Sequence, residues 1–193
     1  MRKQLAVVAM FTVTSWVAAS SWAQPPAAEK PPAEAKPAAG KIEMPKPPPE
    51  NDVIKKSAGT WRCTATGKGP EGQEMKYTST WTVKPTLGGH WYGIVYKRSK
   101  MGPMPGFEGN ATVGFNTAEK KYTFVGFDST GGWINLSSPD GATYSGQGGG
   151  MGKVMPVKFT FVAGKDKKGE ESDKLFDVTL DFGGGTSIEN CKK

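Results

Sequence analysis

The sequence is poor in the residues on which catalytic and metal sites usually depend. It has one histidine, His90, and two cysteines, Cys63 and Cys191, among 193 residues. A metal site built on the two cysteines would lack supporting ligands, because protein metal sites need several His, Cys or carboxylate groups. The nucleophile-elbow motif is absent, and neither glycine cluster ends in Gly-Lys-Ser/Thr. We therefore expect no cofactor and no nucleophilic serine or cysteine.

Long apolar segments are also scarce. Only Leu5 to Ala19 is nearly uncharged and mostly apolar, and it is shorter than the roughly 20 residues that a membrane-spanning helix needs. Met1-Arg2-Lys3 precedes it, and Ser21-Trp22-Ala23 follows with small residues where a signal peptidase reads. These features predict a signal peptide over residues 1–23. The chain would then be exported, periplasmic or secreted, with no membrane span after cleavage; a retained anchor is the alternative.

Residues 24–52 have almost no apolar side chains that could form a core. Proline, alanine, lysine and glutamate dominate them, and proline disfavours both helices and strand ladders. We expect a disordered linker here and one folded domain over residues 53–193. The chain has a net charge of +7, and much of the charge of the folded part lies in turns instead of in one basic stripe among aromatics, so no nucleic-acid partner is expected.

The folded part lacks the 3.6-residue apolar period of helices, apart from a short helix expected around Val53 to Ala58. Apolar and polar residues instead alternate with period two in about ten short runs, clearest over Glu74 to Lys84. The runs follow one another through turns such as Pro139-Asp140-Gly141. The pattern predicts an all-β fold, a barrel or a sandwich, and strands that follow one another by hairpins favour a single antiparallel up-and-down β-barrel.

Cys63 lies in the first predicted strand and Cys191 at the end of the last. Closure of an up-and-down barrel makes these two strands neighbours. An isolated cysteine pair in an exported protein usually forms a disulfide. We therefore predict a Cys63–Cys191 bridge that joins the two ends of the sheet.

One group of motifs resembles a known family. Gly59-Thr60-Trp61 is similar to the Gly-x-Trp opening of lipocalin-like barrels. A more specific ordered set resembles the bacterial domain of unknown function 1579 family, which is related in architecture to lipocalins and nitrobindins. The resemblance implies a barrel of the lipocalin-like (calycin-like) or nitrobindin-like type and transfers no catalytic residue. The set is Leu87-Gly88-Gly89, Phe107-Glu108-Gly109, Gly114-Phe115, Lys120-Lys121-Tyr122 and Asp128-Ser129.

An acid–base pair is the one enzymatic alternative. If Asn116 to Lys120 forms a five-residue turn, Glu108 stands opposite Asp128 across the hairpin. Two carboxylates at a cross-strand position repel when both are ionised, so inside a cavity one would stay protonated. A one-residue change of turn length would separate them. We therefore expect no enzyme, with this pair as the alternative.

Haem binding is a second alternative. Nitrobindin-like barrels hold haem through a histidine, and His90 lies beside aromatic residues that could line an apolar pocket. The haem ligand of those barrels, however, lies among the C-terminal strands, whereas His90 opens the third predicted strand. A structural or surface histidine is the favoured interpretation.

The favoured function is the binding of a small apolar or amphipathic molecule inside the barrel. A further alternative is an envelope-associated structural module that binds no ligand, and the sequence indicates no protein partner. Aromatic side chains supply the apolar area that a cavity needs. The candidate pocket residues are Trp81, Trp91, Tyr92, Glu108, Asn110, Phe124, Asp128 and Trp133.

Overall fold

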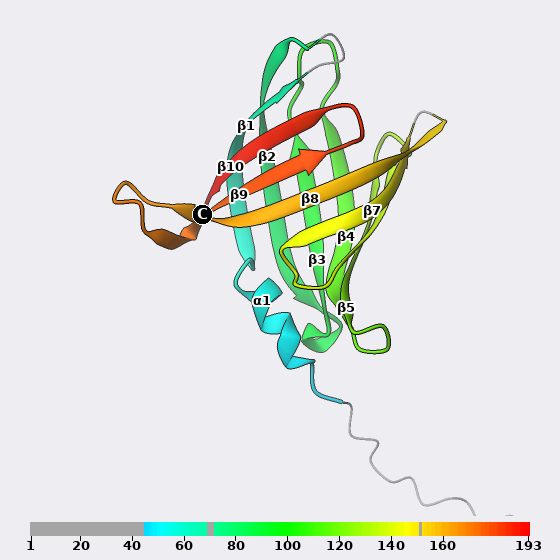
Figure 1. Cartoon of the computed structure of the whole chain (residues 1–193), viewed down its shortest axis with the longest axis vertical. Coiled ribbons are helices and arrows are strands. Elements are labelled where there is room, and N and C mark those ends of the chain that lie inside the picture. The colour runs from blue at the N-terminus through cyan, green and yellow to red at the C-terminus, as the bar shows by residue number, and fades with distance from the viewer. Residues whose placement is uncertain (1–44, 69–71, 151) are drawn as a thin grey trace, which may run out of the picture. The chain divides into compact units, whose positions relative to one another are not determined.

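The computed structural model describes residues 45–68, 72–150 and 152–193. In these residues ten strands form a closed barrel in which each strand pairs antiparallel with its sequence neighbours, and β1 pairs with β10 (Figure 1). The predicted all-β, up-and-down barrel is thus confirmed. The strands are β1 Gly59–Lys68, β2 Glu74–Thr86, β3 Trp91–Arg98, β4 Phe107–Asn116, β5 Lys121–Asp128, β6 Trp133–Ser138, β7 Thr143–Gly150, β8 Lys153–Lys165, β9 Glu171–Asp181 and β10 Thr186–Lys192.

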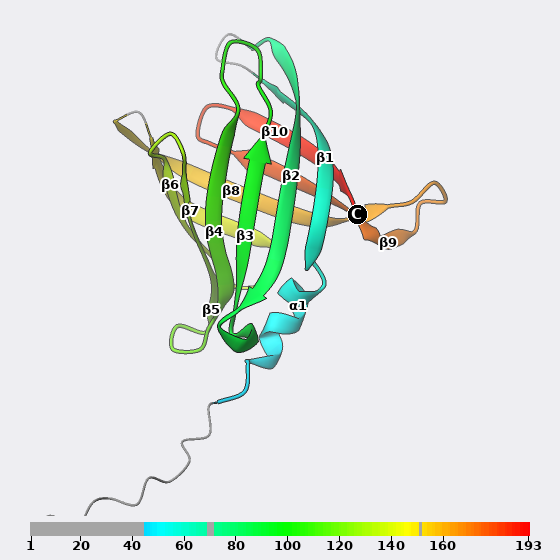
Figure 2. The same ribbon diagram turned by 180° about the vertical axis from the view of Figure 1, so that it is seen from behind.

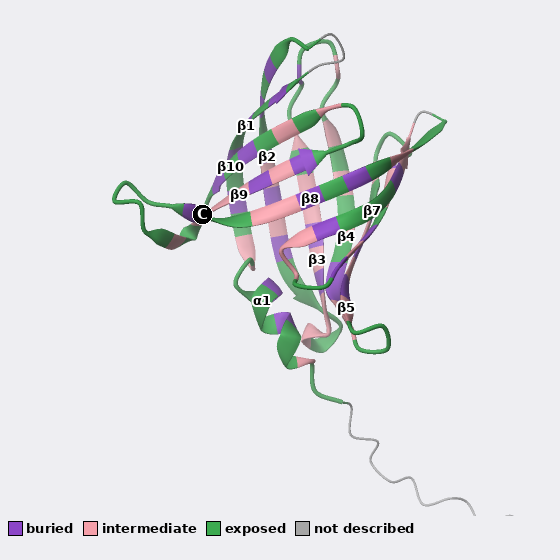
Figure 3. Cartoon of the chain, in the orientation of Figure 1, coloured by how far each residue is buried: buried purple, intermediate pink, exposed green. Residues whose placement is uncertain are grey.

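The period-two pattern of the sequence decides which side chains face the interior. Along β1, Trp61, Cys63 and Ala65 are buried, whereas Arg62 and Thr64 between them are exposed. Figure 3 shows such alternation of buried and exposed positions along the strands. Successive side chains of a strand point to opposite faces, so one apolar face of each strand fills the barrel. The β1–β10 pairing places Cys63 opposite Cys191. The two form the predicted disulfide.

A short N-terminal segment closes one end of the barrel. It comprises the 3-10 turn η1 (Pro49–Asn51) and α1 (Asp52–Lys55), beside the 3-10 turn η2 (Leu87–Gly89) that joins β2 to β3 (Figure 2). Asn51 is 3% exposed; its Nδ2 donates to the carbonyls of Gly89 and His90, and its Oδ1 accepts from the backbone N–H of Phe115. These bonds fasten the segment to the connection between β2 and β3 and to strand β4.

The predicted linker therefore differs from the structure at its end, because residues 45–52 are already ordered against the barrel. The predicted helix over 53–58 is shorter and begins one residue earlier. The predicted signal peptide and the linker up to residue 44 lie outside the described residues. Within the described part, no helix is both long and apolar enough to cross a membrane.

Aromatic side chains in edge-to-face contact fill much of the interior. The Phe161 ring contacts Trp81 and Tyr144 with centroids 6.1 and 5.8 Å apart, and Phe124 contacts Tyr144 and Phe159 at 5.8 and 5.7 Å. Such geometry places the positive edge of one ring against the negative face of the next. The contacts link the interiors of β2, β5, β7 and β8 into one core.

Candidate functional site

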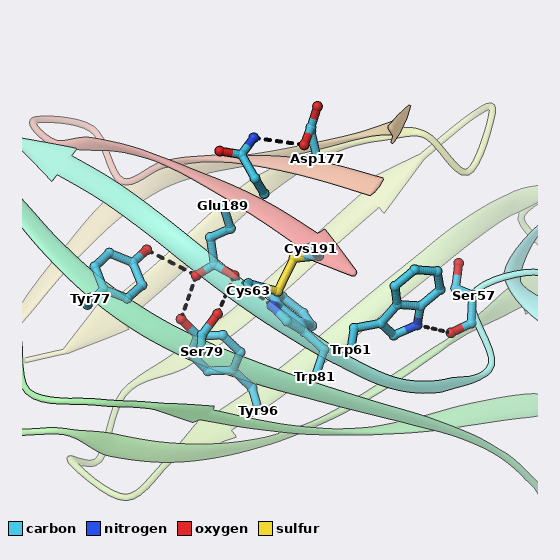
Figure 4. The surroundings of a disulfide bond; sticks show 11 residues. Ser57, Trp61, Cys63, Tyr77, Ser79, Trp81, Tyr96, Asp177, Glu189 and Cys191 are labelled. Carbon is cyan, nitrogen blue, oxygen red and sulfur yellow. Dashed lines mark hydrogen bonds between the residues drawn. A yellow bond between two sulfur atoms is a disulfide. The ribbon is translucent and has the colours of Figure 1, made fainter. Parts of the chain in front are cut away.

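The most unusual group in the interior is the carboxylate of Glu189 on β10, which is 0% exposed. Four side chains donate hydrogen bonds to it (Figure 4). Tyr77 and Tyr96 hydroxyls reach Oε1 at 3.0 and 2.8 Å, and Ser79 Oγ and Trp81 Nε1 reach Oε2 at 2.7 Å each. A carboxylate can only accept, so donors surround it on both oxygens. The negative charge is thereby compensated inside the core.

Strand alternation explains why an acidic residue lies inside the barrel. Cys191 must face inward to bond Cys63, and Glu189 is two residues earlier on the same face of β10. Ile188 and Asn190 are exposed on the other face. The sequence interpretation missed Glu189. The signal was available, because an inward Cys191 forces Glu189 inward too.

The two tyrosines that donate to Glu189 have strongly perturbed acidities. Burial, and then the negative charge of Glu189, raise the pKa of Tyr77 far above its ordinary value. The same two causes, in the same order, raise the pKa of Tyr96. Both phenols therefore keep their protons, and hence their role as donors, over the whole ordinary pH range. The group is a fixed set of hydrogen bonds and not an acid–base pair.

Arg98 lies near this group, at the end of β3 away from α1. Its guanidinium stands over the ring of Phe107, 4.4 Å from the centroid, and 5.7 Å from the centroid of Tyr77. One terminal nitrogen donates to the carbonyl of Pro105 at 3.2 Å. Its Nε–H is buried and has no hydrogen-bond partner among the described residues. A buried donor without an acceptor is costly, so Arg98 is an unsatisfied group in the interior.

An apolar surface lies across the barrel from Glu189. Ala111, Ile134 and Met155 face inward on β4, β6 and β8 in one cross-strand row, separated by Gly126 and Gly148. We call these five residues the apolar row. A Cβ at Gly126 would come 3.0 Å from Ala111 Cβ, and one at Gly148 3.0 Å from Ile134 Cγ2, so side chains cover the glycines. The three side chains are only half-buried. Solvent therefore reaches apolar surface inside the barrel.

The predicted pocket residues fall into three groups. Trp81, Tyr92 and Phe124 are buried in the core, and of these only Trp81 touches Glu189. Trp91 and Trp133 are half-buried, and Asn110 is exposed. Trp133 pairs with Phe127, which is 66% exposed, so Trp133 lies on the outer face of the barrel. The eight candidates therefore do not form one pocket.

The predicted opposition of Glu108 and Asp128 is wrong. Asn116 pairs directly with Lys121, which leaves a four-residue turn, and Asp128 stands opposite Gly109. Asn116 Oδ1 accepts hydrogen bonds from two backbone N–H groups of this turn. Lys120, the last residue of the turn, has a left-handed φ of 52°. Because the turn is one residue shorter than predicted, every residue pairs one position away from its predicted partner. Glu108 is consequently on the outer face, where it pairs with Lys97 at 3.1 Å.

Asp128 itself caps the loop after β5. Its Oδ1 accepts from the backbone N–H groups of Thr130 and Gly132 and from the Thr130 hydroxyl. Burial acts to raise the pKa of Asp128, but these hydrogen bonds, helped by the charge of Arg98, outweigh it and lower the pKa. Asp128 is therefore an ionised loop cap. It lies near Arg98 without forming an acid–base pair.

His90 lies at the closed end, directly after η2. Its Nε2 donates to the carbonyl of Pro45 at 2.9 Å. The ring thus helps to hold the N-terminal segment, which agrees with the structural interpretation of this histidine. Cys63, Cys191 and Glu189 form the one described cluster of three metal-ligating residue types. Its sulfur atoms are joined to each other and its carboxylate is occupied by donors, so the cluster offers no open ligand set.

Two shallow hollows of about 410 Å³ each lie outside the barrel, over β1, β2 and β3. Arg62, Lys97 and Lys192 line one of them among hydroxyl side chains. They are open on the solvent side, and their linings include Ser79 and Arg98 in one and Tyr77 in the other. Since their floor is the pleated sheet itself, we assign the candidate site to the interior, where buried charge and accessible apolar surface lie together.

The fold and the interior together define a lipocalin-like antiparallel barrel with one polar and one apolar side. The model of the family described as "Protein of unknown function (DUF1579)" matches residues 46–163, and the chain belongs to that family. No curated protein matches the sequence. Among solved structures, the S-type phycobiliprotein lyase CPES from Guillardia theta is similar, with 10% identity and a TM-score of 0.46. The match covers 75% of this chain and 94% of the lyase.

Proposed function

We propose that this protein is an exported barrel that binds a small amphipathic molecule in its interior without chemically changing it. The observation that carries the proposal is the apolar row, whose inward-facing side chains stay accessible to solvent. Covering such surface contributes about 25 cal/mol per Å². The polar side chains around Glu189 and Arg98 would orient the ligand, as few convergent polar groups do in other small-molecule sites.

Export is supported by the Cys63–Cys191 disulfide, because structural disulfides persist in oxidising compartments. We further propose that residues 1–23 are removed as a signal peptide and that the linker after them is a spacer. N-terminal sequencing of the mature protein tests this. Gln24 as first residue is the expected result, and retention of Met1 would contradict it.

Filling the interior tests the proposed function. Ala111→Trp adds a large side chain at the apolar row, where Ala111 already contacts the covered backbone of Gly126. Thr112→Trp is the matched control, because Thr112 is the next residue of β4 and is exposed on the outer face. The probe is Nile red, an uncharged dye whose emission rises and shifts to the blue in apolar sites. We expect saturable binding to the wild type and to Thr112→Trp, and at least tenfold weaker binding to Ala111→Trp.

A structural module without a ligand is the second candidate, and the edge-to-face packing of aromatic rings in the core favours it. Under that function, Nile red would bind none of the three proteins, or all three equally through their surfaces. Thermal unfolding of each variant shows whether the fold is retained. Haem is tested in the same samples by hemin titration: a Soret band that disappears in His90→Ala would contradict the structural role of His90.

A further inference from the structure

The polar side of the interior has an imbalance of charge. Its described ionised groups are one guanidinium, Arg98, and two carboxylates, Glu189 and Asp128. Glu189 receives four hydrogen bonds and Asp128 three, all from groups other than Arg98. Neither carboxylate therefore takes a hydrogen bond from the arginine, although the charge of Arg98 helps to lower the pKa of Asp128. A further anion entering this end would meet two negative charges and one positive charge.

Arg98 nevertheless needs an acceptor. Of its N–H groups, one is bonded to the Pro105 carbonyl, and the buried Nε–H is bonded to nothing described. The flanking rings of Phe107 and Tyr77 attract the cation but accept no conventional hydrogen bond from Nε. An oxygen acceptor for this N–H that brought no negative charge of its own would leave the balance of charge unchanged.

The position of Arg98 connects it to the apolar row. Arg98 pairs across the sheet with Phe107 at the start of β4, and Ala111 of the apolar row lies four residues along the same strand. Phe107 and Ala111 share the inward face of β4, and both are half-buried. A molecule with its tail on the apolar row would therefore carry its polar end toward Arg98.

Resting on the proposed function, we propose that the ligand is an uncharged amphipath whose polar end is a carbonyl-type oxygen, and that Arg98 donates a hydrogen bond to this oxygen. We expect the outer bonds of the arginine side chain to rotate on binding, so that its buried Nε–H reaches the ligand oxygen. Glu189 and its donors stay unchanged and exclude anionic ligands by charge. Arg98 is thus a specificity-determining residue.

A series of three ligands with the same tail tests the charge selection. Decanamide is neutral, decanoate is anionic and decylamine is cationic at neutral pH, and their affinities for the full mature protein are measured by isothermal titration calorimetry. We expect decanamide to bind at least tenfold more tightly than either charged ligand. Tighter binding of decanoate would overturn the proposal, since it would show that Arg98 pairs with an anion. Tighter binding of decylamine would overturn it too, since it would show that the carboxylates select the ligand.

Arg98→Met tests the role of the residue. Loss of a hydrogen bond from a charged donor should weaken decanamide binding by at least tenfold. Lys97→Met is the matched control: it removes the same charge from the adjacent residue, which is exposed on the outer face, and should leave the affinity unchanged. Arg98→Lys keeps the charge without the Nε edge, so it should weaken binding as well and serves if Arg98→Met fails to fold.

The two levels of the proposal fail in different ways. If Nile red enters the interior but decanamide binds Arg98→Met as tightly as the wild type, the ligand-binding function stands and the role of Arg98 is wrong. If neither Nile red nor any of the three decyl ligands binds the wild type, both the proposed function and the role of Arg98 are wrong.

Discussion

The two sides of the barrel interior are built differently. On the side of β10, β1 and β2, a disulfide and the fully buried Glu189 with its hydrogen bonds join strands that are far apart in sequence. On the side of β4 to β8, glycines alternate with half-buried apolar side chains in the apolar row. The first side contains the disulfide and the hydrogen bonds to a fully buried carboxylate, and the second contains the accessible apolar surface.

The two sides therefore differ in what they contribute: one stabilises the fold, and the other offers surface for ligand binding. Hydrogen bonds to a buried charge and a covalent link fix one arrangement of the strands at the β1–β10 seam. Accessible apolar surface can instead be covered by a ligand with no change in the strands. Changes on the seam side should therefore act mainly on stability, and changes in the apolar row mainly on binding.

The largest effect should come from the disulfide. Cys63→Ala combined with Cys191→Ala removes a cross-link between residues 128 apart in sequence. We expect a loss of about 4–5 kcal/mol in the free energy of unfolding, because the unfolded chain regains the entropy of an open loop. Urea denaturation of the oxidised wild type and the double variant measures it. A loss below about 1 kcal/mol would mean that the hydrogen bonds hold the seam without the disulfide.

Removing the buried carboxylate should come next. Glu189→Ala leaves buried tyrosine, serine and tryptophan donors without their acceptor, and we expect a loss of about 3–4 kcal/mol. Glu189→Gln keeps one acceptor oxygen and should cost about 2 kcal/mol. Asn190→Ala is the control, because its side chain makes only an exposed hydrogen bond to Asp177. Equal stability of Glu189→Ala and the control would contradict the role of Glu189.

A smaller loss of stability should distinguish a core residue from a residue of the apolar row on the same strand. Leu136 on β6 is 1% exposed, whereas Ile134 on the same face is half-buried. We expect Leu136→Ala to cost about 3 kcal/mol and Ile134→Ala about 1–2 kcal/mol, since partly hydrated side chains lose less on truncation. Nile red affinity should fall in Ile134→Ala, which loses apolar contact area. An equal cost for both would show that the apolar row is ordinary core.

The smallest effect should come from the turn between β6 and β7, which belongs to neither side of the interior. Hydrogen bonds from the backbone N–H groups of Thr143 and Ala142 and from Ser138 lower the pKa of Asp140 to about 2. Because the folded pKa lies below the unfolded one, the ionised carboxylate stabilises the fold above about pH 4, and this contribution is lost as the pH falls toward 2. Thermal unfolding should show this loss in the wild type and not in Asp140→Asn. The same acid dependence in both proteins would assign it to other groups.

Much of the fold follows from local pattern, but the site does not. Alternation along β1 and β2 predicts which side chains face inward, and barrel closure predicts the disulfide. The hairpin between β4 and β5 shows the limit: Asn116 caps a four-residue turn instead of entering a five-residue one, and every cross-strand partner moves by one. The opposition of Glu108 and Asp128 depended on that single residue.

The polar group around Glu189 was missed for a different reason. Its donors come from two strands that precede it by about 90 to 110 residues. No spacing in the sequence therefore predicts that these side chains meet Glu189. The predicted disulfide was enough to place Glu189, because it determines which face of β10 points into the barrel. Arg98 likewise acquires its significance only from its neighbours, since its unsatisfied Nε depends on which groups the folded chain brings to it.

The central claim is that the interior binds a small molecule, and native mass spectrometry tests it most directly. The mature protein is purified from its own host, measured under native conditions and measured again after denaturation, beside Ala111→Trp prepared in the same way. We predict a reproducible extra mass on the wild type that leaves on unfolding and is absent or strongly reduced in Ala111→Trp. A bare polypeptide in both preparations would contradict the claim and favour the structural module.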